Sequence, residues 1–275
     1  MSDRVSITMD NGIADVRLNR PDKLNALDPA MFQGIVEAGE GLKGDPAVRV
    51  VVLSGEGRGF CAGLDFGSFQ AMAGGPAPAP AASEPAADGG LGTIGDTGGR
   101  ITHLGQQAAW VWQELEVPVI AAIHGAALGG GLQIAMGADL RIVAPDAKLS
   151  VLEARWGLIP DMTGTVMLPR LVGLDVAKEL TLTGRMVSGE EAVRLGLATR
   201  VADDPRAAAL ELAADLVTKS PDALREGKRL LNLSGTRPLA EQLHDERATM
   251  GSLIGSPNQV EATMAYFEKR APDFT

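Results

Sequence analysis

The 275-residue sequence has few cysteines, histidines and aromatic residues, and each shortage excludes a class of protein. Its one cysteine, Cys61, excludes a disulfide framework and a cysteine-based zinc cluster. The three histidines are too few and too scattered for a histidine-rich metal site, so we expect no metal. Basic residues are also few, and the net charge of −10 argues against nucleic acid as a partner, because phosphate requires a basic surface.

Signals for secretion or a membrane are missing as well. The first residues lead directly into a strand-like pattern without an apolar leader, so we expect a cytoplasmic protein. Residues 117–138 carry no charge and are long enough to span a bilayer. They contain Pro118, His124 and five glycines, however, so a strand, a turn and a buried helix fit them better. We therefore expect no membrane association.

What the chain does have is the composition of a folded protein, with 45% hydrophobic and 22% charged residues and an excess of glycine. Residues 5–9 and 13–18 alternate apolar and polar around Asn11 and Gly12, which predicts a β-hairpin. Continuous apolar runs predict strands in a sheet that is covered on both faces, at residues 49–53, 117–123 and 140–143. Strands and helices alternate, which indicates an α/β fold.

Strand patterns end near residue 205, and only helices follow. Ser220-Pro221 and Ser256-Pro257 are typical starts of two of them. The predicted helices span residues 207–219, 221–233, 239–254 and 257–269. We therefore divide the chain into an α/β core, residues 1–200, and a helical C-terminal region, residues 201–275, that packs on the core or on another subunit.

One segment of the core differs in kind from the rest. Sixteen of the twenty residues 71–90 are alanine, glycine or proline. Such a segment cannot form a core or a regular helix across its prolines. We interpret about residues 71–99 as a flexible insertion within one domain, with a lid over the binding site as a possible role.

Two glycine-rich segments, residues 54–65 and 124–133, each follow a predicted strand. Neither is a nucleotide-binding motif, because the first has Phe60 where a glycine is required and the second has no P-loop lysine. Glycine leaves backbone N–H groups accessible, and a helix start adds positive potential. Two such loops that face each other would form an oxyanion hole. The alternative is that these glycines only permit tight turns and close helix packing.

Five segments in order resemble the crotonase (enoyl-CoA hydratase/isomerase) superfamily, and the resemblance covers nearly the whole chain. They are the N-terminal signature NRPDKLNAL at residues 19–27, FCAGLD at residues 60–65, the strand and glycine triplet of residues 118–133, residues 183–197, and YFEKR at residues 266–270. The resemblance implies a crotonase-like spiral of repeated ββα units with a C-terminal helical region. It also implies homotrimers, or hexamers built as dimers of trimers.

The resemblance further implies an acyl-CoA thioester substrate, a role in fatty acid metabolism, and no cofactor other than the coenzyme A of the substrate itself. By position, the backbone N–H groups of Leu64 and Gly130 would form the oxyanion hole. The implied contacts to coenzyme A are Lys23, Ala26, Ala62 and Asp65, with Tyr266 and Lys269 from a neighbouring subunit.

The acid/base positions depart from those of the family's hydratases, which use two glutamates. The first position is Gln133 here, and glutamine can orient groups but cannot exchange a proton. The second is Glu153, and Asp161 follows where the dienoyl-CoA isomerase branch also has an acidic residue. We predict Glu153 as the base, Asp161 as a second acid/base or orienting group and Gln133 as an orienting group. Double-bond isomerisation is favoured over hydration.

Alternatives remain for these residues and for the function. Glu153 could be a surface carboxylate beside Arg155, and Asp161 could cap a helix over residues 163–171. The protein could instead add water to 2-enoyl-CoA, or be a non-catalytic acyl-CoA-binding homologue.

Other candidates for chemistry have simpler interpretations. Cys61 has no identifiable partner base, so we interpret it as a packed thiol. His124 ends a buried strand and is interpreted as a hydrogen-bonded core residue. For Trp110, Trp112 and Trp156 we favour packing in the core or an interface over lining an acyl channel.

Overall fold

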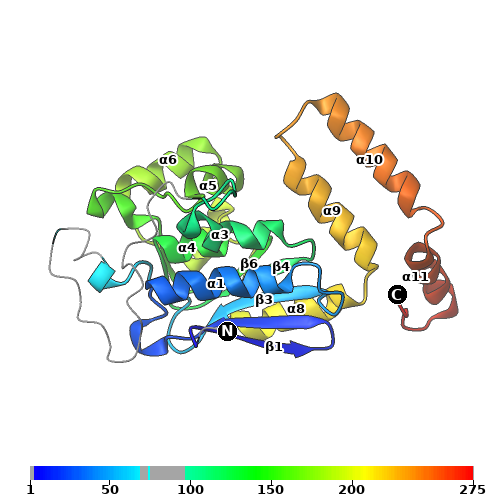
Figure 1. Cartoon of the computed structure of the whole chain (residues 1–275), viewed down its shortest axis with the longest axis horizontal. Helices are drawn as coiled ribbons and strands as arrows, with labels where there is room; N and C mark the ends of the chain where they lie inside the picture. The colour runs from blue at the N-terminus through cyan, green and yellow to red at the C-terminus, as the bar shows by residue number, and fades with distance from the viewer. Residues whose placement is uncertain (1–2, 69–73, 75–96, 275) are drawn as a thin grey trace.

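The computed structural model describes residues 3–68, 74 and 97–274 (Figure 1). The predicted insertion at about residues 71–99, and its proposed role as a lid, fall almost entirely outside the described residues. The described strands form two sheets, one with six strands and one with three.

The six-stranded sheet contains, in spatial order, β1 (Val5–Asp10), β2 (Ile13–Leu18), β3 (Val50–Gly55), β4 (Val119–Ile123), β6 (Leu140–Val143) and β9 (Arg200–Val201). The first two strands form the predicted antiparallel hairpin, and its turn residues Asn11 and Gly12 have positive φ angles of 47° and 81°. From β2 to β9 each strand is parallel to its neighbour.

Helices cover this sheet on both faces, as the continuous apolar runs predict. Every residue of β3 and β4 is buried. On one face, Val52 and Ile120 pack in a cluster with α8 (Pro205–Val217). On the other face lies the main core, to which α1 (Pro29–Leu42) and α3 (Leu104–Glu114) contribute (Figure 1). Each fully buried large side chain contributes about 1.5–3 kcal/mol to stability.

The three-stranded sheet joins β5 (Ala126–Leu128), β7 (Lys148–Ser150) and β8 (Val187–Ser188). Single bridges from Cys61 to Ala127 and from Leu27 to Leu64 extend this second layer. The chain therefore adds a strand to the large sheet, then a segment to the small layer, then a helix. This repeated ββα arrangement confirms the crotonase-like spiral with a helical C-terminal region.

Short helices complete the core. They are α4 (Gly130–Met136), α5 (Gly164–Val172), α6 (Leu174–Thr183) and α7 (Gly189–Leu195), with two 3-10 helices, η1 (Pro21–Lys23) and η2 (Leu152–Trp156). The side chain of Asp28 accepts a hydrogen bond from the Met31 N–H and so caps α1, and Pro29 occupies the first helical position.

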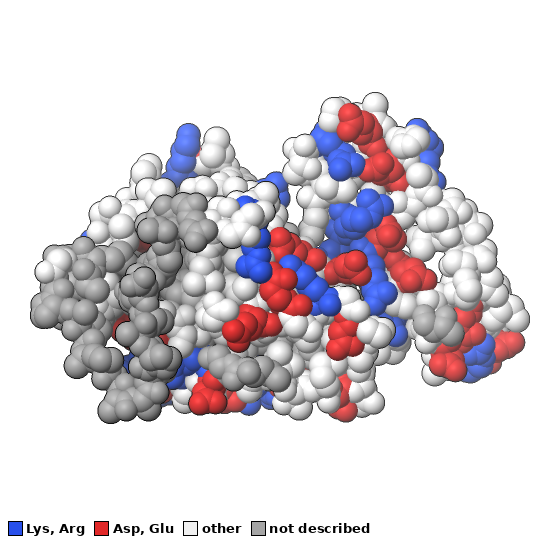
Figure 2. All heavy atoms as spheres, in the orientation of Figure 1, with Lys and Arg blue, Asp and Glu red and all other residues white. Residues whose placement is uncertain are grey.

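The C-terminal helices are α9 (Pro221–Leu233), α10 (Leu239–Leu253) and α11 (Pro257–Glu268), which extend away from the sheets in Figure 1. Ser220 and Ser256 cap α9 and α11 as predicted. These helices expose large apolar side chains, among them Leu239, Met250, Ile254 and Phe267. On the face shown in Figure 2, acidic and basic side chains are interspersed along α9 and the adjoining core. None of the described helices is both long and apolar enough to cross a membrane.

Candidate active site

A single buried asparagine holds the first glycine-rich loop in place. The Asn25 side chain is fully buried, and its Nδ2 donates to the carbonyls of Gly59 and Phe60 at 2.9 and 3.2 Å. The same nitrogen donates to the Glu56 carbonyl at 2.9 Å, and the Asn25 Oδ1 accepts from the Arg20 N–H at 2.8 Å. Sequence reasoning missed this role, although Asn25 lies within the N-terminal signature.

The two glycine-rich loops lie against each other, backbone to backbone. A Cβ atom on Gly63, which has a φ angle of +85°, would lie 2.6 Å from the Leu128 carbonyl oxygen. A Cβ atom on Gly131 would clash with the Cys61 carbonyl oxygen. Only glycine allows this approach. The two loops therefore face each other, as the sequence suggested. The glycines also permit the tight packing of the alternative interpretation, and this packing is what brings the loops together.

The backbone N–H groups of Leu64 and Gly130 differ from those of their neighbours in their hydrogen bonds. The Asp65 N–H donates to the Leu27 carbonyl and the Gly129 N–H to the Ser150 carbonyl. Among the described residues, the Leu64 N–H has no backbone acceptor, and Gly130 begins α4, where an N–H has no partner one turn earlier. Both residues line the same cavity. Two amides with unused donors at one cavity are the feature that an oxyanion hole requires.

This cavity has a volume of about 570 Å³ and a mainly apolar wall. Its apolar lining comes from the loop after η1, from α1, from the two glycine-rich loops and from the segment between η2 and α5. Five side chains that carry polar groups line it, those of His103, Gln133, Glu153, Trp156 and Asp161. The three predicted acid/base and orienting residues therefore meet at one site.

Gln133 is buried, and its amide has a fixed orientation. Its Oε1 accepts from the backbone N–H groups of Met162 and Gly164 at 2.9 and 3.0 Å. Since Oε1 must face these donors, Nε2 turns towards the Glu153 Oε1 and donates to it at 2.6 Å. Gln133 thus joins the start of α5 to the carboxylate. Sequence reasoning gave Gln133 an orienting role but could not locate the two amides that hold it.

Glu153 lies in η2 with one carboxylate oxygen engaged and one unused. Burial raises the pKa of the carboxyl group, and the negative charge of Asp161 raises it further, against hydrogen bonds from its own backbone and from Gln133 that lower it. Its Oε2 is buried and has no hydrogen-bond partner among the described residues. The alternative of a surface carboxylate beside Arg155 is therefore wrong.

Asp161 is exposed at the cavity and does not cap a helix. Helix α5 begins at Gly164, with Thr163 as its N-cap residue. The amides at this helix start, including that of Gly164, are bound by Gln133 instead. The N-cap alternative for Asp161 is therefore wrong, and its carboxylate contributes negative charge near Glu153.

The residues that the resemblance assigns to coenzyme A lie in two separate parts of the chain. Ala62 lines the cavity, and the buried Ala26 directly precedes Leu27, which also lines it. Lys23 is exposed at the end of η1, and Asp65 pairs with Arg20 at 2.7 Å. Burial opposes ionisation of Asp65, but the Arg20 hydrogen bond holds the pKa of this carboxyl below its usual value.

The other two assigned residues, Tyr266 and Lys269, lie at the end of α11. Figure 1 places α11 away from α4, whose first residue, Gly130, lines the cavity. One chain alone therefore does not bring them to its own site.

The simpler candidates are explained by their contacts. The buried Cys61 thiol donates to the Asn25 carbonyl at 3.1 Å, and burial raises the pKa of Cys61 to about 12, so it is a packed thiol as predicted. The His124 Nε2 hydrogen-bonds the Gly57 carbonyl at 3.0 Å. Trp112 is fully buried as the packing interpretation predicts, whereas Trp156 is exposed and lines the cavity, which is the position that the acyl-channel alternative requires.

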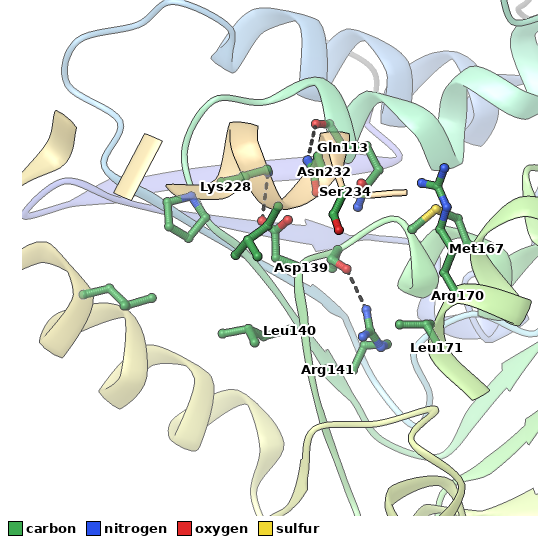
Figure 3. Close-up of a pocket in the computed structure, with 14 residues that line it drawn as sticks. Gln113, Asp139, Leu140, Arg141, Met167, Arg170, Leu171, Lys228, Asn232 and Ser234 are labelled. Atoms are coloured by element: carbon green, nitrogen blue, oxygen red, sulfur yellow. Dashed lines mark hydrogen bonds and ion pairs between the residues drawn. The ribbon is translucent and has the colours of Figure 1, made fainter. Parts of the chain in front are cut away.

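A second cavity, of about 580 Å³, lies between α9 and the core and contains a buried ion pair (Figure 3). The Lys228 Nζ lies 2.8 Å from the Asp139 Oδ2 and donates to the carbonyls of Trp112 and Val117. The same Asp139 oxygen accepts from the Val119 N–H at 2.8 Å. Burial lowers the pKa of Lys228 and raises that of Asp139, against their mutual attraction. This polar cluster is saturated, as expected of a structural ion pair.

Comparisons with known proteins agree with this fold. The enoyl-CoA hydratase/isomerase family model matches residues 13–273, so the chain belongs to this family. A probable enoyl-CoA hydratase of Bacillus subtilis is 33% identical over 98% of both chains, and 1,2-epoxyphenylacetyl-CoA isomerase of Escherichia coli is 33% identical over 97% of this chain and 96% of its own. The crystal structure of an enoyl-CoA hydratase from Bacillus anthracis matches with a TM-score of 0.84 at 29% identity, over 98% of each chain. The resemblance to the crotonase superfamily is confirmed.

Proposed function

We propose that this protein moves a carbon–carbon double bond of an acyl-CoA thioester into conjugation with the thioester carbonyl, with Glu153 as the acid/base group. Family membership supports the general hydratase/isomerase type and an acyl-CoA substrate. The observation that carries the choice of isomerisation is the Glu153 carboxylate itself, which has one oxygen bound to Gln133 and one buried oxygen without a partner.

The proposed reaction starts from a 3-enoyl-CoA. The Glu153 Oε2 takes a proton from C2, and the electron pair of that C–H bond moves towards the thioester oxygen to form a dienolate. The N–H groups of Leu64 and Gly130 stabilise the negative charge on this oxygen. The carboxyl group then returns the proton to C4, the double bond lies between C2 and C3, and Glu153 is again ionised.

The raised pKa of Glu153 suits both halves of this cycle. A carboxylate with a higher pKa is a stronger base, and the acid that it forms still returns its proton to the dienolate. The Gln133 hydrogen bond to Oε1 holds the carboxylate in one orientation. We assign Asp161 two roles, to raise the pKa of Glu153 and to act as a second acid/base or orienting group at the far end of the substrate.

Hydration of 2-enoyl-CoA is the second candidate, and the names of relatives favour it. They include (E)-benzylidenesuccinyl-CoA hydratase of Thauera aromatica, which is 32% identical over 98% of this chain. Hydration requires groups that bind water and exchange its protons. The Gln133 amide cannot supply a proton, and both of its polar ends already have protein partners. In this candidate Asp161 would have to replace the missing glutamate.

Product analysis separates these candidates. The protein is offered 2-enoyl-, 3-enoyl- and 3,5-dienoyl-CoA, and the products are analysed by mass and by absorbance. Isomerisation keeps the mass and creates a conjugated thioester, whereas hydration adds the mass of one water. Rapid hydration of 2-enoyl-CoA without bond migration would overturn the isomerase proposal. Tight binding of all three without reaction would favour a non-catalytic acyl-CoA-binding protein.

We also propose that the site is completed by a neighbouring subunit in a homotrimer, or in a hexamer made of two trimers. Tyr266 is largely exposed on α11, away from the cavity of its own chain, and the surrounding helices expose apolar side chains. In this arrangement Tyr266 and Lys269 of one subunit meet the coenzyme A held beside Lys23 of the next. Light scattering tests the assembly. The cytoplasmic location and the role in fatty acid metabolism stay predictions.

A further inference from the structure

His103 is the N-cap residue of α3, and its hydrogen bonds there fix which ring nitrogen is the acceptor. Its Nδ1 accepts from the Gly105 N–H at 3.1 Å, and the Gln106 Oε1 accepts from the His103 N–H at 3.2 Å, which together form a capping box. Histidine is not among the residues usually preferred at this position. Because Nδ1 is the acceptor, the neutral ring carries its proton on Nε2, on the side of the ring away from the helix start.

The His103 ring lies at the same cavity as Glu153, on the side of Met162 that faces α3. The Cβ position of Gly105 is 3.0 Å from the His103 Cε1 and 3.9 Å from the Met162 Cγ. The Met162 Sδ in turn lies 2.7 Å from the Cβ position of Gly130. Met162 therefore stands between the start of α3 and the proposed oxyanion hole. A ligand group beside His103 would therefore lie across Met162 from the proposed oxyanion hole.

The polar side chains of this cavity differ in whether they can donate a hydrogen bond to a ligand. The amide group of Gln133 donates to Glu153 and accepts from two backbone N–H groups. Glu153 and Asp161 accept hydrogen bonds when ionised. Gln133 is 1% exposed, so its second amide hydrogen is not open to a ligand. The side-chain donors that remain in the described part of the cavity are the Trp156 indole N–H and the His103 Nε2–H, and the latter has no protein acceptor among the described residues.

We infer that His103 determines substrate specificity by donating its Nε2–H to a neutral oxygen on the acyl chain, such as a ketone, hydroxyl or ether. The inference rests on the proposed acyl-CoA site and names its substrate class. A neutral acceptor fits better than a carboxylate, because Glu153 and Asp161 already place negative charge at this cavity. A purely hydrocarbon chain would leave this donor unsatisfied inside the complex.

The test measures the binding of saturated thioesters, which do not undergo double-bond migration. Hexanoyl-CoA is compared by calorimetry with 4-oxohexanoyl-CoA and 5-oxohexanoyl-CoA, which place the same neutral acceptor at two depths. We expect one oxo compound to bind about fivefold more tightly than hexanoyl-CoA, the gain typical of one added hydrogen bond. Equal or weaker binding of both oxo compounds would overturn the inference.

Two variants decide whether His103 causes the preference. His103→Asn keeps a cap acceptor near the position of Nδ1 but has no donor at Nε2, so the affinity ratio should fall to about one. Gln106→Ala weakens the same helix start but keeps the imidazole, so the ratio should persist. A preference that survives in His103→Asn contradicts the inference. Failure of the wild-type protein to bind even hexanoyl-CoA would instead refute the proposed acyl-CoA site.

Discussion

Two cavities of nearly equal volume, about 570 and 580 Å³, lie in this protein and differ in how their polar groups are used. Beside α9, the Asp139–Lys228 pair is saturated by each other and by backbone groups (Figure 3). At the glycine-rich loops, the Glu153 Oε2 and the Leu64 N–H have no protein partner among the described residues. Volume therefore does not identify the reactive site here. Residues with unsatisfied polar atoms that line one cavity do.

The largest effect on the reactive cavity is expected from Glu153→Gln. The variant keeps an oxygen that can accept from Gln133 but loses the proton-transfer group, so kcat should fall by about 10³-fold. Acyl-CoA binding, measured by calorimetry, should persist because the apolar wall and the oxyanion amides are unchanged. Retained turnover would remove Glu153 from the role of base.

The matching change in the saturated cavity is Lys228→Met, which should affect stability and not chemistry. It leaves Asp139 buried without its cation, and the loss of one partner of a buried pair costs about 3–5 kcal/mol. Denaturant unfolding measures this loss. The double variant Asp139→Asn with Lys228→Met should recover part of it, and kcat per folded molecule should stay near the wild-type value. A selective loss of kcat in either variant would erase the distinction between the cavities.

Gly63→Ala should reduce catalysis by about 10²-fold, the loss typical of a misplaced oxyanion donor. The added Cβ would press on the Leu128 carbonyl and force the neighbouring Leu64 amide to move. Gly235→Ala is the control, because Gly235 also has a positive φ angle, +74°, but nothing lies within 4 Å of its Cβ position. If both variants lose stability equally and keep full kcat, the Leu64 amide is not part of the site.

The smallest effect concerns pH. The pKa of Glu153 is raised above the usual carboxyl value of 4.5. As the pH decreases, kcat/KM should therefore begin to fall at a pH above 4.5, because Glu153 becomes protonated and can no longer act as a base. Folding disfavours the ionised form of Glu153, so this residue lowers the free energy of unfolding at a pH above its pKa in the folded protein. The effect is absent at a pH low enough to protonate it in both the folded and the unfolded protein. Glu153→Gln should therefore raise Tm by about 1–3 °C near pH 7, and this gain should disappear near pH 4. A constant gain at all pH values would contradict the raised pKa.

The sequence predicted the regular elements well, because they depend on local patterns, and the three side chains that it proposed for acid/base or orienting roles line one cavity. The hairpin at Asn11-Gly12 and the caps at Ser220 and Ser256 need only neighbouring residues. The resemblance supplied Glu153 and Gln133, and the structure brings them within 2.6 Å.

What the sequence could not supply depends on contacts between distant segments. The buried Asn25 reaches carbonyls more than thirty residues away, and the two amides that fix Gln133 lie in the turn before α5 and at its first residue. The Asp161 cap failed because a side chain from α4 takes its place at that helix start. These hydrogen-bond partners are brought together because the spiral stacks segments that are far apart in the chain. The spacing of residues within one segment therefore cannot predict them.

The most direct test of the central claim is the fate of a 3-enoyl-CoA incubated with the protein in deuterated water. The account predicts that the double bond moves to C2, that deuterium appears at C4 to the extent that Glu153 exchanges its proton with solvent, and that no water is added. Glu153→Gln should leave the substrate unchanged. Formation of a 3-hydroxyacyl-CoA as the first product, or bond migration at the wild-type rate in Glu153→Gln, would contradict it.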